Sequence, residues 1–315
     1  MHKKVLLSGV KPTGRPHVGN YFGAMKQFVD LQNDYNAFIM IADLHALTIL
    51  KDAPLIKQYT LDLALDYLAI GLNPEKVILF KQSDISEHAE LAWIFDCITT
   101  VPYLERAHAY KDAVAKGKEA NAGLFTYPVL MSADILLYSA DVVPIGKDNK
   151  QHVEYARDTA EKFNRIFGET FKLPEPLILG EVETVPGLDG QKMSKSYGNT
   201  IPLFAEDEEI KKLCMSIVTD SSGERPENVY QIHKLFKSEA ELEKLYEEKK
   251  GKYKELKEAL IEDVIAFITP LREKRKKLAK NPEQVINLLR TGAEKAKAVA
   301  STKMSEIKEQ VGINL

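Results

Sequence analysis

Two lysines on a predicted loop are the most distinctive chemical feature of this chain of 315 residues. Lys192 and Lys195 lie three residues apart in the segment Lys-Met-Ser-Lys-Ser, residues 192–196, where neither a helical nor a strand period is present. Ammonium groups with neighbouring hydroxyls can hold a pyrophosphate and stabilise the negative charge that grows as it leaves, so no protein nucleophile is needed. On composition alone, a solvated polar loop is the alternative interpretation.

A second segment, Pro-Thr-Gly-Arg-Pro-His-Val-Gly-Asn at residues 12–20, follows a short apolar run near the start of the chain. Gly14 and Gly19 allow the backbone to approach a ligand closely. We expect a helix to begin near Gly19 and to offer unpaired N–H groups to a phosphate, with His17 and Asn20 as side-chain donors. The segment is not a Walker A loop, because no Gly-Lys-Ser/Thr follows, and a turn with capping residues is the alternative.

Together the two segments predict a nucleoside triphosphate site, and the surrounding elements must bring them together. Apolar runs predict strands, and amphipathic stretches predict helices between them. The alternation predicts an α/β fold with a doubly wound, Rossmann-like parallel sheet covered on both faces, whose ligand crevice lies beyond the carboxyl ends of the strands. The predicted strands are residues 5–9, 37–42, 77–80, 142–145 and 177–179, and the predicted helices are residues 19–31, 55–70 and 149–167.

After about Pro202 the strand-like runs disappear and Glu, Lys, Leu and Ala dominate, which predicts an all-helical C-terminal region. Helical periods are present at residues 256–271, 285–289 and 292–311. We therefore predict a catalytic domain over residues 1–196 that ends with the lysine-rich loop, and a helical domain over residues 197–291. A last helix, about 292–315, is expected to pack back on the catalytic domain.

The composition narrows the classes of protein to which this chain can belong. A net charge of −3 excludes nucleic-acid binding by overall charge alone, although a local patch stays possible. The two cysteines, Cys97 and Cys214, are too few and too distant for a disulfide framework or a cysteine-based metal site, so no protein-held structural metal is expected. The first apolar run is too short for a signal peptide, and no run approaches the ~18 residues that span a bilayer. A cytoplasmic protein without membrane contact is expected.

The two segments resemble the His-Ile-Gly-His and Lys-Met-Ser-Lys-Ser signatures of the class I aminoacyl-tRNA synthetases. Asn20 in the fourth place of the first signature is similar to the bacterial tryptophanyl enzymes, whereas tyrosyl enzymes usually carry His there. Further segments match along essentially the whole chain, which makes the resemblance specific. They are residues 42–46, 124–138, 143–152, 217–221 and 292–296.

The resemblance implies a role for each matched position of the nucleotide site. The first segment would contact ATP, Asp148 with Gly146 would hold the ribose, Val185 would lie near the adenine edge, and the lysines would hold the β- and γ-phosphates. His17, Asn20, Lys192 and Lys195 would be the catalytic residues, and ATP would bring Mg²⁺ with it. The implied ATP-binding residues are Lys11, Pro12, Thr13, Gly19, Asn20, Gly146, Lys147, Asp148, Val185, Lys192, Met193, Ser194, Lys195 and Ser196.

The resemblance also implies a tryptophan pocket in which the Asp134 carboxylate accepts the indole N–H, a group that can only donate. Tyr127, Met131, His45 and Leu7 would form the rest of this pocket. From the residues alone, Asp134 reads as a paired structural residue, His45 as a satisfied core histidine, and Tyr127 and Met131 as core.

Several positions depart from the commonest bacterial pattern. Asn149 stands where Gln is usual, Leu7 replaces a frequent Phe, and residues 106–113 lack a familiar Gln, which leaves open the contact to the substrate amine. Lys111 in that segment is a candidate phosphate contact. The basic run at residues 272–277 reads as a solvated helix face or as a contact to tRNA phosphates.

The function that the resemblance implies is the activation of L-tryptophan with ATP and its transfer to the 2′-hydroxyl of the terminal adenosine of tRNA(Trp), by a homodimer. A tyrosyl-tRNA synthetase is the nearest alternative. A non-catalytic RNA-binding paralogue and a cytidylyltransferase are others, but the paralogue would not need two intact signatures. The cytidylyltransferase would not explain residues 131–134 or the helical region.

Overall fold

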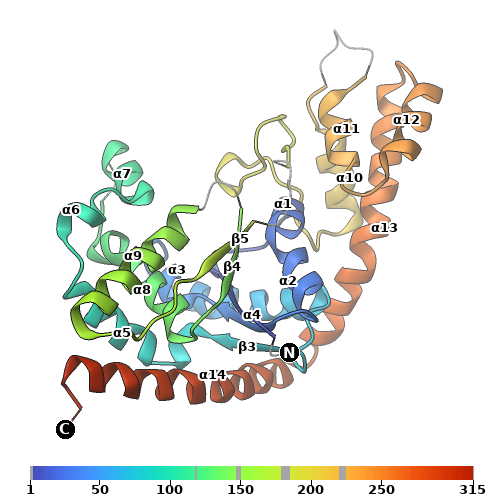
Figure 1. Cartoon of the computed structure of the whole chain (residues 1–315). Coiled ribbons are helices and arrows are strands. Elements are labelled where there is room, and N and C mark those ends of the chain that lie inside the picture. Colours follow the sequence, from blue (N-terminus) through green and yellow to red (C-terminus); the bar gives the residue numbers. More distant parts are fainter. Residues whose placement is uncertain (1–2, 118, 147–149, 179–184, 220–224, 315) are drawn as a thin grey trace.

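The computed structural model describes residues 3–314 except 118, 147–149, 179–184 and 220–224. Figure 1 shows a twisted sheet with helices packed around it, and a helical region that rises beside it. A long helix connects the helical region to the sheet, and the last helix runs beneath the sheet. The predicted α/β architecture with a C-terminal helical region is confirmed.

The sheet has five parallel strands in the order β3-β2-β1-β4-β5. After β1 the chain adds β2 and β3 on one side, and it then crosses over to add β4 and β5 on the other. The carboxyl ends of β1 and β4 therefore flank the point where the strand order reverses, which is where open α/β sheets bind their ligands. The strands are β1 (Val5–Val10), β2 (Asn36–Ile41), β3 (Val77–Lys81), β4 (Val142–Ile145) and β5 (Glu175–Ile178).

Helices cover both faces of the sheet, as near-continuously apolar strands require. One face packs against α5, α8 and α9, with Phe38 and Phe80 in its core, and the other packs against α2 and α4, with Leu6 and Ile39 in its core. The helices of this part are α1 (Val18–Asn20), α2 (Lys26–Leu31), α3 (Asp43–Ala46), α4 (Ala53–Ala69), α5 (Glu87–Asp96), α6 (Val101–Leu104), α7 (His108–Ala115), α8 (Ala122–Leu137) and α9 (Lys150–Phe167), with a π-helical turn, Tyr21–Met25, between α1 and α2.

The last helix, α14 (Pro282–Val311), crosses the edge of the sheet at β3. Val285 and Leu289 belong to the core on one face, while Ala296 and Met304 belong to the core on the other. At the crossing, a Cβ on Gly292 would lie 1.8 Å from the Leu79 carbonyl oxygen. Only glycine permits this approach, and the helix thereby covers an edge strand that would otherwise expose unpaired backbone groups.

The helical region consists of α10 (Asp207–Met215), α11 (Glu227–His233), α12 (Glu239–Glu248) and α13 (Tyr253–Ala279). Its core includes Val264 and Ile268 of α13, and Met193 of the lysine-rich loop packs in the same core with Val18 of α1. The loop therefore has one side on the helical region and the other on the sheet domain. The predicted helices at 285–289 and 292–311 are one continuous helix, and the proposed boundaries at residues 196 and 291 stay predictions.

Candidate active site

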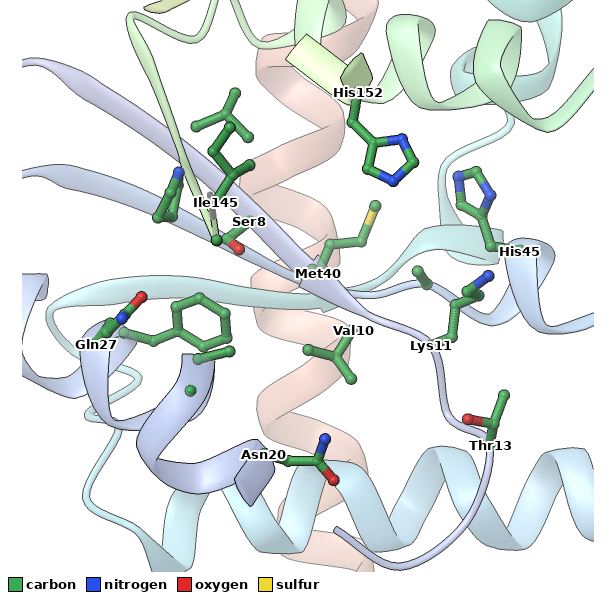
Figure 2. Close-up of a pocket in the computed structure, with 18 of the residues that line it drawn as sticks. Ser8, Val10, Lys11, Thr13, Asn20, Gln27, Met40, His45, Ile145 and His152 are labelled. Atoms are coloured by element: carbon green, nitrogen blue, oxygen red, sulfur yellow. The ribbon is translucent and has the colours of Figure 1, made fainter. Parts of the chain in front are cut away.

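A cavity of about 970 Å³ lies at the carboxyl ends of β1 and β4, at the strand-order reversal (Figure 2). Its walls come from the start of the chain, from α8, and from the lysine-rich loop. The predicted site residues that line it are Leu7, Lys11, Thr13, His17, Gly19, Asn20, His45, Tyr127, Met131, Asp134, Gly146, Val185, Lys192, Met193, Ser194 and Lys195. Pro12 and Ser196 are not among the lining residues, and Lys147, Asp148 and Asn149 lie outside the described residues.

At the end of β1, His17 caps α1 through two reciprocal hydrogen bonds. Its Nδ1 accepts the Asn20 backbone N–H at 3.2 Å, and the Asn20 side-chain oxygen accepts the His17 N–H at 3.1 Å. Burial, and then the nearby charge of Lys195, lower the pKa of His17 to about 4. The ring is therefore neutral near pH 7, which leaves Nδ1 able to accept.

The first turn of α1 does not offer the unpaired N–H groups that the sequence predicts. The Val18 N–H donates to the Ile201 carbonyl at 2.9 Å, and the Gly19 N–H donates to the Met193 thioether at 3.4 Å. The Asn20 N–H is used by the cap. The expectation of a free helix start is wrong because the lysine-rich loop packs directly on this turn. A thioether is a weak acceptor, so the Gly19 N–H is the least firmly bound of the three.

The lysine-rich loop is anchored to the first segment by side chains and backbone. Lys195 Nζ donates to the Gly14 carbonyl at 2.9 Å, and the Leu203 N–H donates to the Pro16 carbonyl at 3.0 Å. Partial burial lowers the pKa of Lys195. The two predicted halves of the site, 181 residues apart in sequence at this hydrogen bond, are thus in contact.

Asn199 organises this loop, although the sequence analysis does not single it out. Its side-chain NH₂ donates to Asp189 Oδ1 at 2.7 Å and to the Lys192 carbonyl at 3.1 Å, and its oxygen accepts the Ser194 N–H at 2.8 Å. Asn199 is buried. This arrangement requires a glycine at position 187, because a Cβ there would lie 2.3 Å from the Asn199 side chain.

At the other end of the cavity, the Asp134 carboxylate on α8 is buried and accepts three hydrogen bonds. His45 Nε2 lies 2.8 Å from Oδ2, His88 Nδ1 lies 2.6 Å from Oδ1, and the Gln82 amide donates to Oδ1 at 2.7 Å. Burial alone would raise the pKa of Asp134, but the hydrogen bonds from His45 and His88 and the electrostatic interaction with their rings outweigh it and hold the pKa far below its usual range. Asp134 is therefore an anion at the wall of the cavity.

Figure 2 shows the imidazoles of His45 and His152 near the Lys11 ammonium and the thioether of Met40. The His152 ring packs against the Tyr127 ring with centroids 6.1 Å apart. Burial, and then the charge of Lys11, lower the pKa of His152. His152, Gln27 and Met40 line the cavity without having been predicted as site residues; His152 belongs to the 143–152 match, but spacing gave no signal for the others.

The basic run at residues 272–277 is not simply a solvated face. Arg272 is buried and donates to the Ala205 carbonyl, and Arg275 pairs with Asp62 and Asp66 of α4. Both guanidinium groups therefore act within the chain: Arg275 holds α13 against the sheet domain, and Arg272 ties α13 to the segment at the start of α10. Lys276 pairs with Glu206 at 2.9 Å.

The whole-chain comparisons agree with one another. A family model for class I tRNA synthetases (W and Y) matches residues 2–293. A tryptophan–tRNA ligase of Fusobacterium nucleatum subsp. nucleatum is 50% identical over 98% of this chain and 97% of its own length. Two solved structures of tryptophanyl-tRNA synthetases are also similar. The one from Campylobacter jejuni, complexed with ADP and tryptophan, has a TM-score of 0.91 at 44% identity, covering 98% of this chain and 99% of its own. The one from Mycoplasma pneumoniae has a TM-score of 0.86 at 31% identity, covering 98% of both chains.

Proposed function

The chain belongs to the class I tRNA synthetase family of the tryptophan and tyrosine enzymes, and from that premise we propose that its cavity activates tryptophan with ATP. The activity is that of a tryptophan–tRNA ligase. The observation that carries the proposal is the anionic carboxylate of Asp134 at one end of a cavity whose other end is formed by His17, Asn20 and the lysine-rich loop.

Tryptophan binds with its indole N–H toward Asp134. The indole nitrogen only donates, and a buried carboxylate that finds no donor is costly, so a side chain without this N–H is rejected. Met131 and Tyr127 of α8, with Leu7 of β1 and the His45 ring, enclose the rest of the side chain. A phenol O–H could also donate to this carboxylate, so the argument against the tyrosyl alternative is the 50% identity to a tryptophan–tRNA ligase over 98% of this chain.

ATP binds between the first segment and the lysine-rich loop. One carboxylate oxygen of tryptophan forms a bond to the α-phosphorus, the bond from that phosphorus to the oxygen bridging to the β-phosphate breaks, and pyrophosphate leaves with the electron pair. Lys192 and Lys195 neutralise the growing charge, and His17 and Asn20 orient the nucleotide. Positions 147 and 148, assigned to the ribose side, lie outside the described residues.

Without a nucleotide, the Lys195 ammonium donates a hydrogen bond to the Gly14 carbonyl. The side chain must therefore turn toward the phosphates when ATP enters. The same movement frees the Gly19 N–H from Met193 for a phosphate oxygen. Loop closure after ATP binding is therefore a local exchange of partners.

Magnesium enters with the nucleotide as part of the substrate. Among the described residues, no group of three or more His, Cys, Asp and Glu side chains is arranged to hold a metal ion. Mg²⁺ favours phosphate oxygens and retained waters, so a site without a protein cage fits it.

In the second step the 2′-hydroxyl of the terminal adenosine of tRNA(Trp) attacks the carbonyl carbon of the adenylate, and AMP leaves. The helical region would receive the anticodon arm.

We place this work in the cytoplasm, with two copies of the chain forming a homodimer. Trp93 on α5 and Val101 on α6, 69% and 59% exposed, are apolar side chains that a second copy would cover. Within the described residues, no helix combines the length and apolar character that crossing a bilayer requires.

Pyrophosphate exchange with each amino acid in turn tests the proposal. We expect exchange that depends on tryptophan. Exchange with tyrosine but not tryptophan would replace the assignment with the tyrosyl enzyme, and exchange with neither would favour a non-catalytic RNA-binding protein.

A further inference from the structure

Beyond the tryptophan-binding role of Asp134, we propose that His88 and Tyr138 act as positioning residues that leave this carboxylate one open acceptor position, on Oδ2, reserved for the indole N–H. The inference rests on the proposed function. His88 and Tyr138 are not among the residues that line the cavity, so they act through Asp134 and not by touching the substrate.

The number of hydrogen bonds supports this inference. An ionised carboxylate can accept about four hydrogen bonds, two at each oxygen. Among the described residues, Oδ1 already accepts two, from His88 at 2.6 Å and from the Gln82 amide at 2.7 Å, whereas Oδ2 accepts one, from His45 at 2.8 Å. The next donor must therefore reach Oδ2.

The direction of each donor is also determined by its other partner. The Gln82 side-chain oxygen accepts the backbone N–H of His45 at 3.4 Å, which turns its NH₂ group toward Asp134. His88 Nε2 lies 2.8 Å from the Tyr138 hydroxyl. The Asp134 carboxylate can only accept, so His88 Nδ1 carries the proton that faces Oδ1. In the neutral ring Nε2 is then an acceptor, and the Tyr138 hydroxyl donates to it.

Packing holds this chain of donors rigid. His88 is fully buried and its ring packs against Phe80 with centroids 6.2 Å apart. The Tyr138 ring stacks on Phe38 at 4.7 Å and contacts Phe80 at 5.6 Å. Removal of the Tyr138 hydroxyl leaves all of this ring packing in place, so Tyr138→Phe isolates the hydrogen bond from the core.

The test compares two amino acids in pyrophosphate exchange: tryptophan, and 3-benzothienylalanine, in which sulfur replaces the indole N–H. His88→Leu removes a hydrogen bond to a charged carboxylate, and such a bond contributes more than one between neutral groups. We therefore expect kcat/KM for tryptophan to fall roughly 10- to 100-fold in this variant. The same variant should change kcat/KM for benzothienylalanine by less than about 3-fold, because that substrate never used the open position. KM for ATP should stay unchanged.

His88→Asn is the conservative variant, because a side-chain amide can donate to Oδ1 from the direction of Nδ1; we expect it to restore most of the preference for tryptophan. Tyr138→Phe should lower the preference by roughly 3- to 10-fold, and it keeps the test decisive if His88→Leu does not fold. An equal loss for both amino acids in the folded variants would overturn the proposal and make His88 and Tyr138 structural. Absence of tryptophan-dependent exchange in the unaltered protein would instead overturn the proposed function.

Discussion

The two ends of the cavity are built by different means. At the amino-acid end, Asp134, His45, His88 and Gln82 come from four elements, and each is buried and hydrogen-bonded before any ligand is present. At the phosphate end, Lys192 and Lys195 are exposed on a loop whose contacts to the first segment run mainly through backbone groups and a thioether.

The difference follows from what each end must recognise. An indole ring has the same shape and charge throughout the reaction, so a rigid site with one open acceptor discriminates best. A triphosphate changes its charge distribution as pyrophosphate leaves, so the groups that meet it must move and exchange partners. A change at one end should therefore leave the other end intact.

Asp134→Asn should damage the amino-acid end alone. It removes the charge that His45 and His88 surround, and breaking a buried charged network costs about 3–5 kcal/mol, or roughly 10²- to 5 × 10³-fold in kcat/KM for tryptophan. KM for ATP should change by less than about 3-fold if the ends are independent. Steady-state pyrophosphate exchange, with each substrate varied in turn, measures both values.

Asp43→Asn is the matched control for Asp134→Asn. Asp43 is also a buried aspartate, it accepts hydrogen bonds from Ser83, and it does not line the cavity. We expect a loss of thermal stability without a selective rise in KM for tryptophan. Equal losses of tryptophan and ATP affinity in Asp134→Asn would show that the residue is structural and that the two ends are one unit.

Lys195→Met should damage the phosphate end alone. The methionine keeps most of the side-chain length but removes the charge, and loss of one group that stabilises a transition-state charge costs roughly 10²-fold in kcat. Single-turnover formation of the adenylate measures this step directly, and the tryptophan dependence should be unchanged.

Lys211→Met serves as control, because Lys211 is an exposed lysine of α10 that pairs with Glu208 away from the cavity. It should leave the rate of adenylate formation as it is. A kcat for Lys195→Met close to the unaltered value would mean that Lys192 suffices and that the second lysine only ties the loop to Gly14.

Asn199→Ala tests whether the phosphate end depends on loop geometry as well as on charge. The change removes the hydrogen bonds to Asp189, to the Lys192 carbonyl and from the Ser194 N–H, while both lysines stay in place. At about 1 kcal/mol for each net hydrogen bond, partly recovered by water, we expect a 5- to 20-fold fall in kcat/KM for ATP.

Hydrogen exchange of the amides of residues 187–203 should become faster in Asn199→Ala, and the tryptophan KM should not move. Asn287→Ala is the control, since Asn287 is an exposed asparagine of α14 that does not line the cavity and whose side-chain oxygen accepts a hydrogen bond from Arg290. Faster exchange with an unchanged ATP dependence would show that the loop needs no fixed shape.

The sequence predicts the sheet well because each strand is a short apolar run with turn residues at its ends. All five predicted strands overlap observed ones, and the parallel sheet is confirmed. Residues 87–115 form α5, α6 and α7, which the sequence analysis does not predict. These helices contact different neighbours, among them α8 and α14, so their buried residues do not form one clear apolar stripe. The hydrophobic periodicity therefore does not predict them as helices.

The site shows the same limit at the level of single residues. The matched motifs place most of the predicted residues on one cavity, and their roles stay predictions. The motifs do not reveal His88 or Gln82, which lie 46 and 52 positions from Asp134 in sequence, nor the burial of Arg272 and the long-range ion pairs of Arg275. A buried polar pair forms only after tertiary packing brings its members together, so its residues look like any other polar position in a sequence.

The smallest predicted effect concerns the protonation of His17 at the phosphate end. Its pKa is lowered to about 4 by burial and, secondarily, by Lys195, whereas an unfolded histidine titrates near 6.5. The folded state therefore favours the neutral ring. The stability that His17 contributes is complete above about pH 6.5 and is lost as pH falls toward 4. An NMR titration of the ring protons, assigned with His17→Gln, should show no His17 step between pH 8 and about 5.

In Lys195→Met the pKa of His17 should rise only part of the way toward 6.5, because the larger cause, burial, remains. Binding of ATP should raise it further, since a triphosphate brings negative charge beside the ring. A His17 pKa near 6.5 in the free protein would contradict the packed arrangement of the loop on α1, and the phosphate end would then be open to water. A low pKa that climbs with ATP would show that the loop exchanges its internal contacts for the nucleotide, while the Asp134 end, already satisfied except at Oδ2, has no such exchange to make.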